Sequence, residues 1–195
     1  MKKPFVISIS GISGSGKTTI ANALKKRVAN TEVINFDNIS GDLPGQDYCE
    51  WSESGADCNE WILTPIIDEI ERLCSDPLEY IVLDYPFGTA HRKVGAYVDI
   101  SVWIDIPLDI SLARRILRDF TRCSKIRHPL KGHVAEEVSS YLDYYLARHR
   151  DTYLRHIETI RPFVDLIVDG TNTPEEITDE ILSYINTRNH LRCPH

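Results

Sequence analysis

Residues 5–24, FVISISGISGSGKTTIANAL, decide the fold of this chain. The stretch opens with an apolar, β-branched run, turns glycine-rich, and continues with apolar residues at helical spacing. Gly11, Gly16, Lys17 and Thr18 satisfy G-x-x-x-x-G-K-[ST], which between a strand and a helix is a polyphosphate-binding loop. We therefore expect an α/β protein that binds a nucleoside triphosphate here.

Each part of this loop has an expected role. Its glycines let backbone N–H groups face the phosphates, and the N-terminus of the next helix adds positive charge. Lys17 is expected to reach the β- and γ-phosphates as a catalytic residue, and Thr18 to hold Mg²⁺. The predicted loop contacts to the nucleotide are Gly11, Ser13, Gly14, Ser15, Gly16, Lys17, Thr18 and Thr19.

Strands alternate with helices along the rest of the chain. Strands are predicted at 5–10, 32–36, 80–83, 100–104 and 163–168. Helices are predicted at 17–30, 59–73, 107–122, 134–160 (bent or broken once) and 174–185, with 38–58 a loop holding one short helix. Asn59 and Thr173 are expected to be helix caps. The pattern predicts a three-layer P-loop NTPase fold, a five-stranded parallel sheet with helices on both faces.

Length and composition narrow the class of protein. The 195 residues suggest a single domain, 1–195. A net charge of −7 argues against a general nucleic-acid binder, and no run approaches the 18 apolar residues of a membrane span. Five cysteines without a C-x-x-C pair predict free thiols in a reducing cytoplasm and no zinc site. The oligomeric state is not visible in the sequence.

Four aspartates, Asp37, Asp84, Asp105 and Asp169, stand at or just past the ends of predicted strands, where ligands collect in parallel sheets, and two of them are candidate site residues. Asp37 is the candidate base that accepts the proton of an acceptor hydroxyl, and its alternative is a turn or cap residue. Asp84 closes the apolar run IVLD and is the candidate carboxylate beside the metal, with a loop cap as its alternative.

Charge is distributed unevenly. No lysine or arginine lies between Arg27 and Arg72, a stretch with eleven acidic residues, whereas 114–131 has seven bases and one acid. Arg114, Arg115 and Arg118 repel one another on a helix unless they share an anion, so we expect a lid over the phosphates. Arg114 and Arg118 are the candidate catalytic arginines. The alternative is a solvated basic helix. We also expect the segments 114–131 and 38–60 to attract each other across the site.

A family resemblance rests on several passages. RRILRDFTRC (114–123) resembles the R-R-x-x-R-D-x-x-x-R lid motif of uridine kinases and related P-loop nucleoside kinases. GISGSGKTT, Asp37, VWIDIPLDISLARRILRD and RPFVDLIVDGTNT are similar to that family's phosphate loop, catalytic aspartate, lid helix and adenine-side loop. The resemblance covers 5–37 and 79–187. It implies ATP and Mg²⁺, a helical lid at about 114–133, and nucleotide contacts from Arg115 and Asn172.

The phosphate acceptor is less well defined, because 38–78, the expected acceptor-binding insert, matches no part of that family. Asn38 and Ile39 follow Asp37, and Asp84-Tyr85-Pro86 replaces the family's Glu-Gly. The scarcity of bases favours a neutral or cationic hydroxyl compound such as a nucleoside over a monophosphate. The expected acceptor contacts are Asp37, Asp84, Tyr85, His91 and Arg92, with Phe87 beside them and Tyr48, Trp51 and Trp61 able to stack on a ring.

Two other functions are compatible with the loop. One is a nucleotide-driven switch or assembly factor that binds a protein partner, although no N-K-x-D motif and no D-x-x-G after the third strand is present. The other is a kinase for a sugar acid or another anionic metabolite, which the acidic segment disfavours. The arginine-rich segment suits phosphoryl transfer better than switching.

Overall fold

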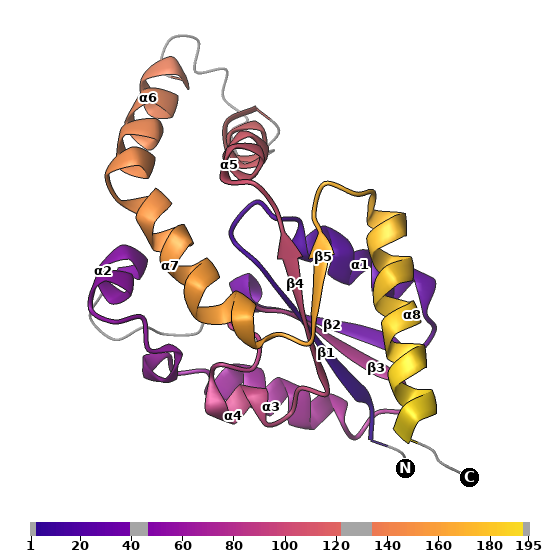
Figure 1. Cartoon of the computed structure of the whole chain (residues 1–195). Coiled ribbons are helices and arrows are strands. Elements are labelled where there is room, and N and C mark those ends of the chain that lie inside the picture. The colour runs from indigo at the N-terminus through magenta and orange to yellow at the C-terminus, as the bar shows by residue number, and fades with distance from the viewer. Residues whose placement is uncertain (1–2, 40–46, 122–133, 193–195) are drawn as a thin grey trace.

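A five-stranded parallel sheet forms the centre of the computed structural model, which describes residues 3–39, 47–121 and 134–192 (Figure 1). The strands are β1 (Phe5–Ser10), β2 (Thr31–Asn35), β3 (Tyr80–Asp84), β4 (Ile100–Asp105) and β5 (Leu166–Asp169). Their order is β2-β3-β1-β4-β5, and every neighbouring pair is parallel. The predicted fold class is confirmed.

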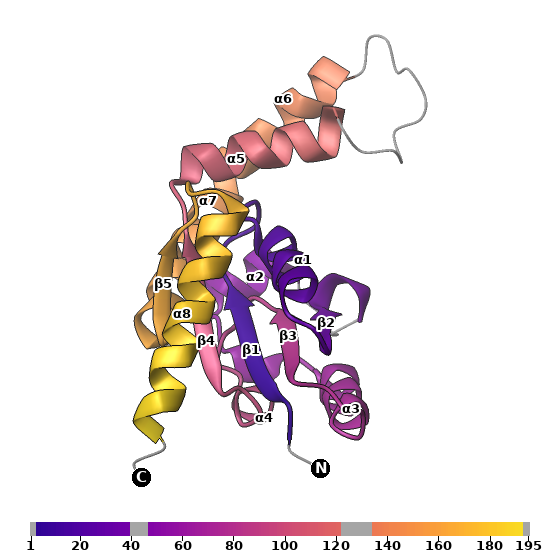
Figure 2. The same cartoon turned by 90° about the vertical axis from the view of Figure 1, so that its right-hand side faces the viewer.

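Helices cover both faces of the sheet and bury separate apolar clusters. On one face, α1 (Lys17–Arg27) and α8 (Pro174–Arg192) pack against the sheet through residues such as Ile20, Leu24 and Ile181. On the other face, α3 (Thr64–Leu73), α4 (Arg92–Gly95) and α7 (Arg150–Ile160) contribute Ile70, Val94 and other side chains. Figure 2 shows α8 lying along the sheet. The central strands are buried on both faces, which is why they are almost uniformly apolar.

Two further helices extend beyond the carboxyl edge of the sheet (Figure 2). They are α5 (Leu108–Ile116), which continues as a π-helical turn at Leu117–Thr121, and α6 (Val134–Tyr144). A second π-helical turn, Tyr145–His149, joins α6 to α7, so the interruption predicted within 134–160 lies there. Such turns interrupt the helical ladder and are frequent at functional sites. Residues 122–133 of the expected lid lie outside the described residues.

Several predicted boundaries were wrong. The helix expected from Asn59 begins at Thr64, because Cys58–Glu60 form a 3₁₀ turn and the Asn59 side chain accepts the backbone N–H of Arg92 at 2.9 Å. The last strand begins only at Leu166, because Arg161–Phe163 form a 3₁₀ turn. Helix α8 runs past residue 185 to Arg192.

Other local predictions were confirmed, and one short helix was missed. The short helix expected within 38–58 is α2 (Tyr48–Glu53). Thr173 caps α8, since its Oγ1 accepts the Glu176 N–H at 3.3 Å. The four-residue helix α4 was not predicted.

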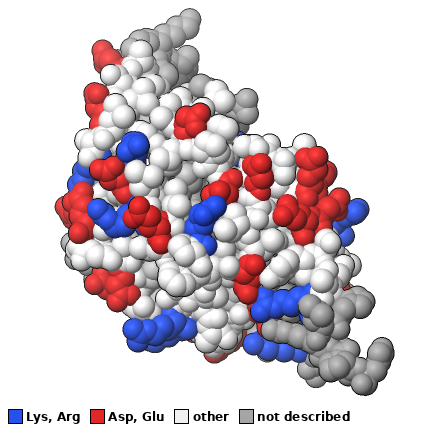
Figure 3. All heavy atoms as spheres, in the orientation of Figure 1, with Lys and Arg blue, Asp and Glu red and all other residues white. Residues whose placement is uncertain are grey.

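Charged side chains of both signs are interspersed on the face shown in Figure 3. Across residues 3–39, 47–121 and 134–192, no helix combines the length and apolarity that a membrane span requires.

Candidate functional site

A cavity of about 600 Å³ opens at the carboxyl edge of the sheet and collects most of the predicted site residues. The predicted residues that line it are Gly11, Ser13, Gly14, Gly16, Lys17, Thr18, Thr19, Asp37, Asp84, Arg114, Arg115 and Arg118, together with Tyr48, Trp61 and Phe87. The lining residues that sequence reasoning missed are Ile12, Phe36, Pro86, His149, Tyr153 and His156.

The phosphate loop lies directly beneath α5. Gly14 adopts φ +86°, and a Cβ at this position would lie 2.5 Å from the backbone oxygen of Ser111. The Ser111 hydroxyl also donates to the backbone oxygen of Ser13 at 2.6 Å. Only glycine allows this approach, so the loop sequence and the position of α5 determine each other.

Lys17 is enclosed within the loop. Its Nζ donates to the backbone oxygens of Gly11 at 3.0 Å and Ile12 at 3.2 Å. Burial lowers the pKa of Lys17, while the charges of Asp84 and Asp37 oppose that shift. A bound polyphosphate would supply the negative charge that a buried ammonium lacks.

Thr18 and Asp84, the two residues predicted to hold Mg²⁺, are hydrogen-bonded to each other. The Thr18 hydroxyl donates to Asp84 Oδ2 at 2.5 Å, and Asn35 Nδ2 donates to the same oxygen at 3.0 Å. Asp84 is 4% exposed, and burial raises the pKa of its carboxyl despite the Thr18 hydrogen bond and the Lys17 charge. Asp84 therefore faces the loop and does not cap the segment that follows β3.

A hydroxyl and a carboxylate are oxygen ligands of the kind that Mg²⁺ prefers. Within the described part of the chain, no three His, Cys, Asp or Glu side chains form a metal site by themselves. The pair of Thr18 and Asp84 fits a cation that keeps waters and takes its other ligands from nucleotide phosphates.

Asp37 lies in the 3₁₀ turn Phe36–Asn38 that follows β2, and it is exposed at the cavity. Asn35, which sequence reasoning missed, caps this turn: its Oδ1 accepts the Asp37 N–H at 2.9 Å while its Nδ2 reaches Asp84. The capping role considered for Asp37 thus belongs to Asn35. The Asp37 carboxylate lines the cavity, where it could meet an acceptor hydroxyl.

Three arginines of the lid passage line the cavity. Arg114 donates to the backbone oxygens of Gly170, at 3.1 Å, and of Ser15, at 3.4 Å. Arg115 donates to the hydroxyl of Tyr153, and Arg118 pairs with Asp119 at 2.6 Å. Arg114 and Arg115 thus contact the loop and α7, whereas Arg118 is exposed and pairs with Asp119 on its own helix.

Aromatic rings form the other end of the cavity. Phe36, Trp61 and Phe87 contact one another with centroid distances of 5.4 to 5.9 Å, and the Tyr48 ring lies 6.4 Å from Trp61. The buried indole N–H of Trp61 has no hydrogen-bond partner within the described residues. Trp51, the third predicted stacking residue, does not line the cavity: it is 2% exposed, and its indole N–H donates to the Asp57 backbone oxygen.

His156 joins the aromatic end to helix α7. Its Nδ1 lies 3.3 Å from the Tyr48 hydroxyl, and its Nε2 lies 3.0 Å from the backbone oxygen of Pro86. Burial, with the nearby charge of Lys17, lowers the pKa of His156 to about 4. The ring is therefore neutral at pH 7, with Nε2–H donating to Pro86 and Nδ1 accepting from Tyr48.

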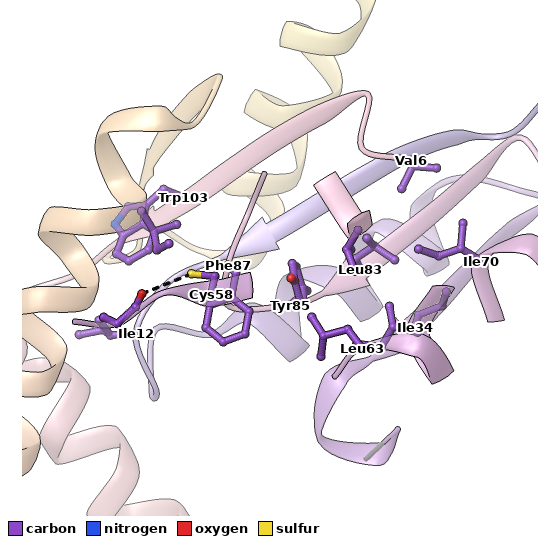
Figure 4. Close-up of a cluster of buried hydrophobic side chains, with 14 of the residues drawn as sticks. Val6, Ile12, Ile34, Cys58, Leu63, Ile70, Leu83, Tyr85, Phe87 and Trp103 are labelled. Carbon is purple, nitrogen blue, oxygen red and sulfur yellow. Dashed lines mark hydrogen bonds between the residues drawn. The ribbon is translucent and has the colours of Figure 1, made fainter. Parts of the chain in front are cut away.

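Besides Trp51, five predicted site residues do not line the cavity. Tyr85 is 1% exposed and packs in the apolar cluster with Leu63, Leu83 and Phe87 (Figure 4). His91 is buried: its Nδ1 accepts the Val94 N–H as the cap of α4, and its Nε2 lies 3.2 Å from the Trp61 backbone oxygen. The other three are Arg92, exposed on α4; Ser15, buried within the loop; and Asn172, exposed after β5.

The predicted attraction between 38–60 and 114–131 falls largely on residues 40–46 and 122–131, which lie outside the described residues. In the described residues, Arg148 pairs with Glu53 at 3.0 Å and with Asp47 at 3.6 Å, and both acids flank or lie in α2. Arg155 donates to the backbone oxygen of Ser52 at 2.7 Å. Within the described residues, bases of the π-helical turn and of α7 therefore bind the α2 end of the acidic segment.

Comparisons with known proteins agree with this geometry. The model of the adenylylsulphate kinase family matches residues 3–49. A uridine kinase of Borrelia duttonii (strain Ly) is 26% identical and aligns over 93% of this chain and 94% of its own length. A uridine kinase of Clostridium botulinum (strain Langeland) is 24% identical over 86% of this chain and 89% of its own.

Solved structures show the same fold. A gluconokinase from Sinorhizobium meliloti 1021 superposes with a TM-score of 0.55 at 16% identity and covers 100% of both chains. Shikimate kinase from Aquifex aeolicus gives 0.52 at 18% identity, covering 95% of this chain and 98% of its own. The resemblance to uridine kinases and related P-loop kinases is thus confirmed over most of the chain, and these relatives support an ATP-dependent kinase.

Proposed function

We propose that this protein transfers the γ-phosphate of ATP to a hydroxyl group of a nucleoside or a similar neutral or cationic metabolite. The observation that carries the proposal is that one cavity holds both a phosphate loop with three arginines and an aromatic end with Asp37. That arrangement supports phosphoryl transfer, whose catalysis depends on positioning and on positive charge around the transferring group.

The residues of the cavity supply the parts of this reaction. Asp37 accepts the proton as the acceptor oxygen bonds to the γ-phosphorus, and the bond to the β–γ bridging oxygen breaks to release ADP. Lys17, Arg114 and Arg118 stabilise the charge on the phosphates. Mg²⁺, held by Thr18 and Asp84, would neutralise the β- and γ-phosphate oxygens.

The charges of the cavity favour an acceptor without an anionic group. The lining cations Lys17, Arg114, Arg115 and Arg118 belong to the loop and to the passage that begins in α5. Asp37 follows Phe36 in the cavity lining and interacts electrostatically with Lys17 and Arg118, whereas Arg92 lies elsewhere on α4. Among the lining residues that the structure describes, the arginines are Arg114, Arg115 and Arg118, so a carboxylate or phosphate on the acceptor would compete with the nucleotide phosphates for the same cations. The unpaired Trp61 N–H suits a hydroxyl or carbonyl oxygen of the acceptor.

The proposal extends to the domain organisation of the chain and to its cellular setting. A single domain (1–195) would hold the acceptor segment at about 38–78 and the lid at about 114–133. The buried thiols Cys49 and Cys58 are free, which supports a reducing, cytoplasmic setting.

The test is Mg²⁺-ATP consumption with a panel of nucleosides, nucleoside monophosphates, sugar acids and polyols, with the phosphorylated product identified by mass. We expect turnover on a neutral or cationic hydroxyl compound and little ATP hydrolysis without one. Turnover confined to monophosphates or sugar acids would contradict the acceptor class. Slow hydrolysis that no metabolite stimulates would instead favour the nucleotide-driven switch.

A further inference from the structure

Helix α7 carries two buried side chains that reach opposite ends of the cavity. Tyr153 and His156 are 5% and 4% exposed, and both line the cavity. Residues three apart lie on the same side of a helix, so one rigid element presents both.

Tyr153 contacts the phosphate end. Its hydroxyl accepts a hydrogen bond from Arg115 Nη1, and Tyr153 lines the cavity together with Ser13 of the loop. The Arg115 guanidinium lies 5.2 Å from the ring centroid of Tyr141 on α6 and 6.0 Å from that of Tyr153. Arg115 is thus held by a hydroxyl and two ring faces, a geometry suited to a guanidinium.

His156 contacts the acceptor end. It bridges the Tyr48 hydroxyl at 3.3 Å and the Pro86 backbone oxygen at 3.0 Å. Helix α2, which carries Tyr48, is held against α7 and the π-helical turn before it. Arg148 of that turn pairs with Glu53, and Arg155 of α7 donates to the backbone oxygen of Ser52. The orientation of the Tyr48 ring therefore depends on α7.

We propose that Tyr153 and His156 are positioning residues, with Tyr153 holding Arg115 over the nucleotide phosphates and His156 holding the Tyr48 ring against the acceptor. Both act through another side chain, and α7 sets the span between the two ends. The inference rests on the proposed function, because the two ends are assigned to ATP and to the acceptor.

The two roles predict that each variant changes a different parameter, the Kd for ATP or the KM for the acceptor. Tyr153→Phe keeps the ring and removes the hydroxyl, so ATP should bind about tenfold more weakly while the acceptor KM stays within twofold of the wild type. His156→Gln keeps an amide donor for the Pro86 oxygen but has no acceptor at the Nδ1 position that faces Tyr48, so the acceptor KM should rise about tenfold while the Kd for ATP is unchanged. A lesion that merely loosened α7 would change both parameters in both variants.

The experiment measures the Kd for a non-hydrolysable ATP analogue by calorimetry, without acceptor, and the acceptor KM at saturating ATP. Tyr145→Phe is the matched control. The Tyr145 ring, in the π-helical turn before α7, lies 6.2 Å from the Tyr153 ring, and Tyr145 does not line the cavity. Tyr48→Phe should reproduce the His156→Gln effect, and the double variant should be no worse than either single one, because both remove one hydrogen bond.

The outcomes separate this inference from the proposed function. If Tyr153→Phe binds the analogue as tightly as the wild type, the role of Tyr153 is overturned whatever the acceptor is. If His156→Gln and Tyr48→Phe have additive effects on KM, the role of His156 is overturned. A wild type that phosphorylates no acceptor would overturn the proposed function, while the binding measurement would still decide the role of Tyr153.

Discussion

Replacing Gly14 by alanine tests whether α5 rests on the phosphate loop. The φ of +86° costs an L-residue about 1–2 kcal/mol. The new Cβ would lie 2.5 Å from the Ser111 backbone oxygen and 3.1 Å from Arg115 Cγ, whereas real Cβ contacts stay above 3.0 Å. Helix α5 must therefore retreat, and such overpacking costs about 1–3 kcal/mol more. Together these terms lower the free energy of unfolding by about 2–5 kcal/mol.

Gly55→Ala is the matched control, because Gly55 also has positive φ, +130°, but its Cβ would meet nothing within 4 Å. Thermal unfolding should show a Tm loss of about 4–20 °C for Gly14→Ala, at about 2–4 °C per kcal/mol. Gly55→Ala should lose only the part due to backbone strain. Since α5 carries Arg114 and Arg115, kcat/KM for ATP should also fall, by about ten- to a hundredfold, in Gly14→Ala alone.

Equal Tm losses in the two variants, with kcat/KM for ATP unchanged in Gly14→Ala, would refute the reasoning. That result would mean that α5 is free to move away from the loop without consequence for stability or nucleotide use.

Two further predictions concern buried titratable groups. The folded-state pKa of His156 is about 4, below the ordinary 6.5, so its contribution to stability is present above pH 6.5 and is lost as the pH falls toward 4. Between pH 7 and 5 the wild type should lose about 2 kcal/mol more than His156→Gln in urea unfolding, and equal losses would contradict this. Burial raises the pKa of Asp84, so its charge lowers stability as the pH rises through its folded-state pKa. Asp84→Asn should therefore match or exceed the wild-type Tm at pH 7 yet lose at least about a hundredfold in kcat, and a lower Tm with retained activity would oppose the assignment.

The sheet and the phosphate loop could be predicted because their signals are local. Apolar β-branched runs mark buried strands, and the spacing of Gly11, Gly16, Lys17 and Thr18 is read within eight residues. Asp84 was found for the same reason, since it closes an apolar run directly.

The aromatic end could not be predicted as a unit, because Phe36, Tyr48, Trp61 and Phe87 come from separate segments that only the tertiary fold brings together. Tyr85 and Phe87 are both aromatic residues that closely follow Asp84 in the sequence, yet of the two only Phe87 lines the cavity.

The positions of His91 and His156 depended on partners that the sequence does not show. His91 was predicted to contact the acceptor, but the four-residue helix that it caps has no periodicity to reveal it. Nothing near His156 in the sequence indicates that its ring meets Tyr48 and Pro86.

The most direct test of the central claim is the turnover of Asp37→Asn on the best acceptor, measured beside its Kd for ATP. Asp68→Asn, an exposed change on α3, is the control. We predict that Asp37→Asn binds ATP like the wild type and loses at least about a hundredfold in kcat, as expected for removal of a general base. Wild-type kcat in Asp37→Asn would contradict the assignment of Asp37 as the base and with it the proposed geometry of transfer.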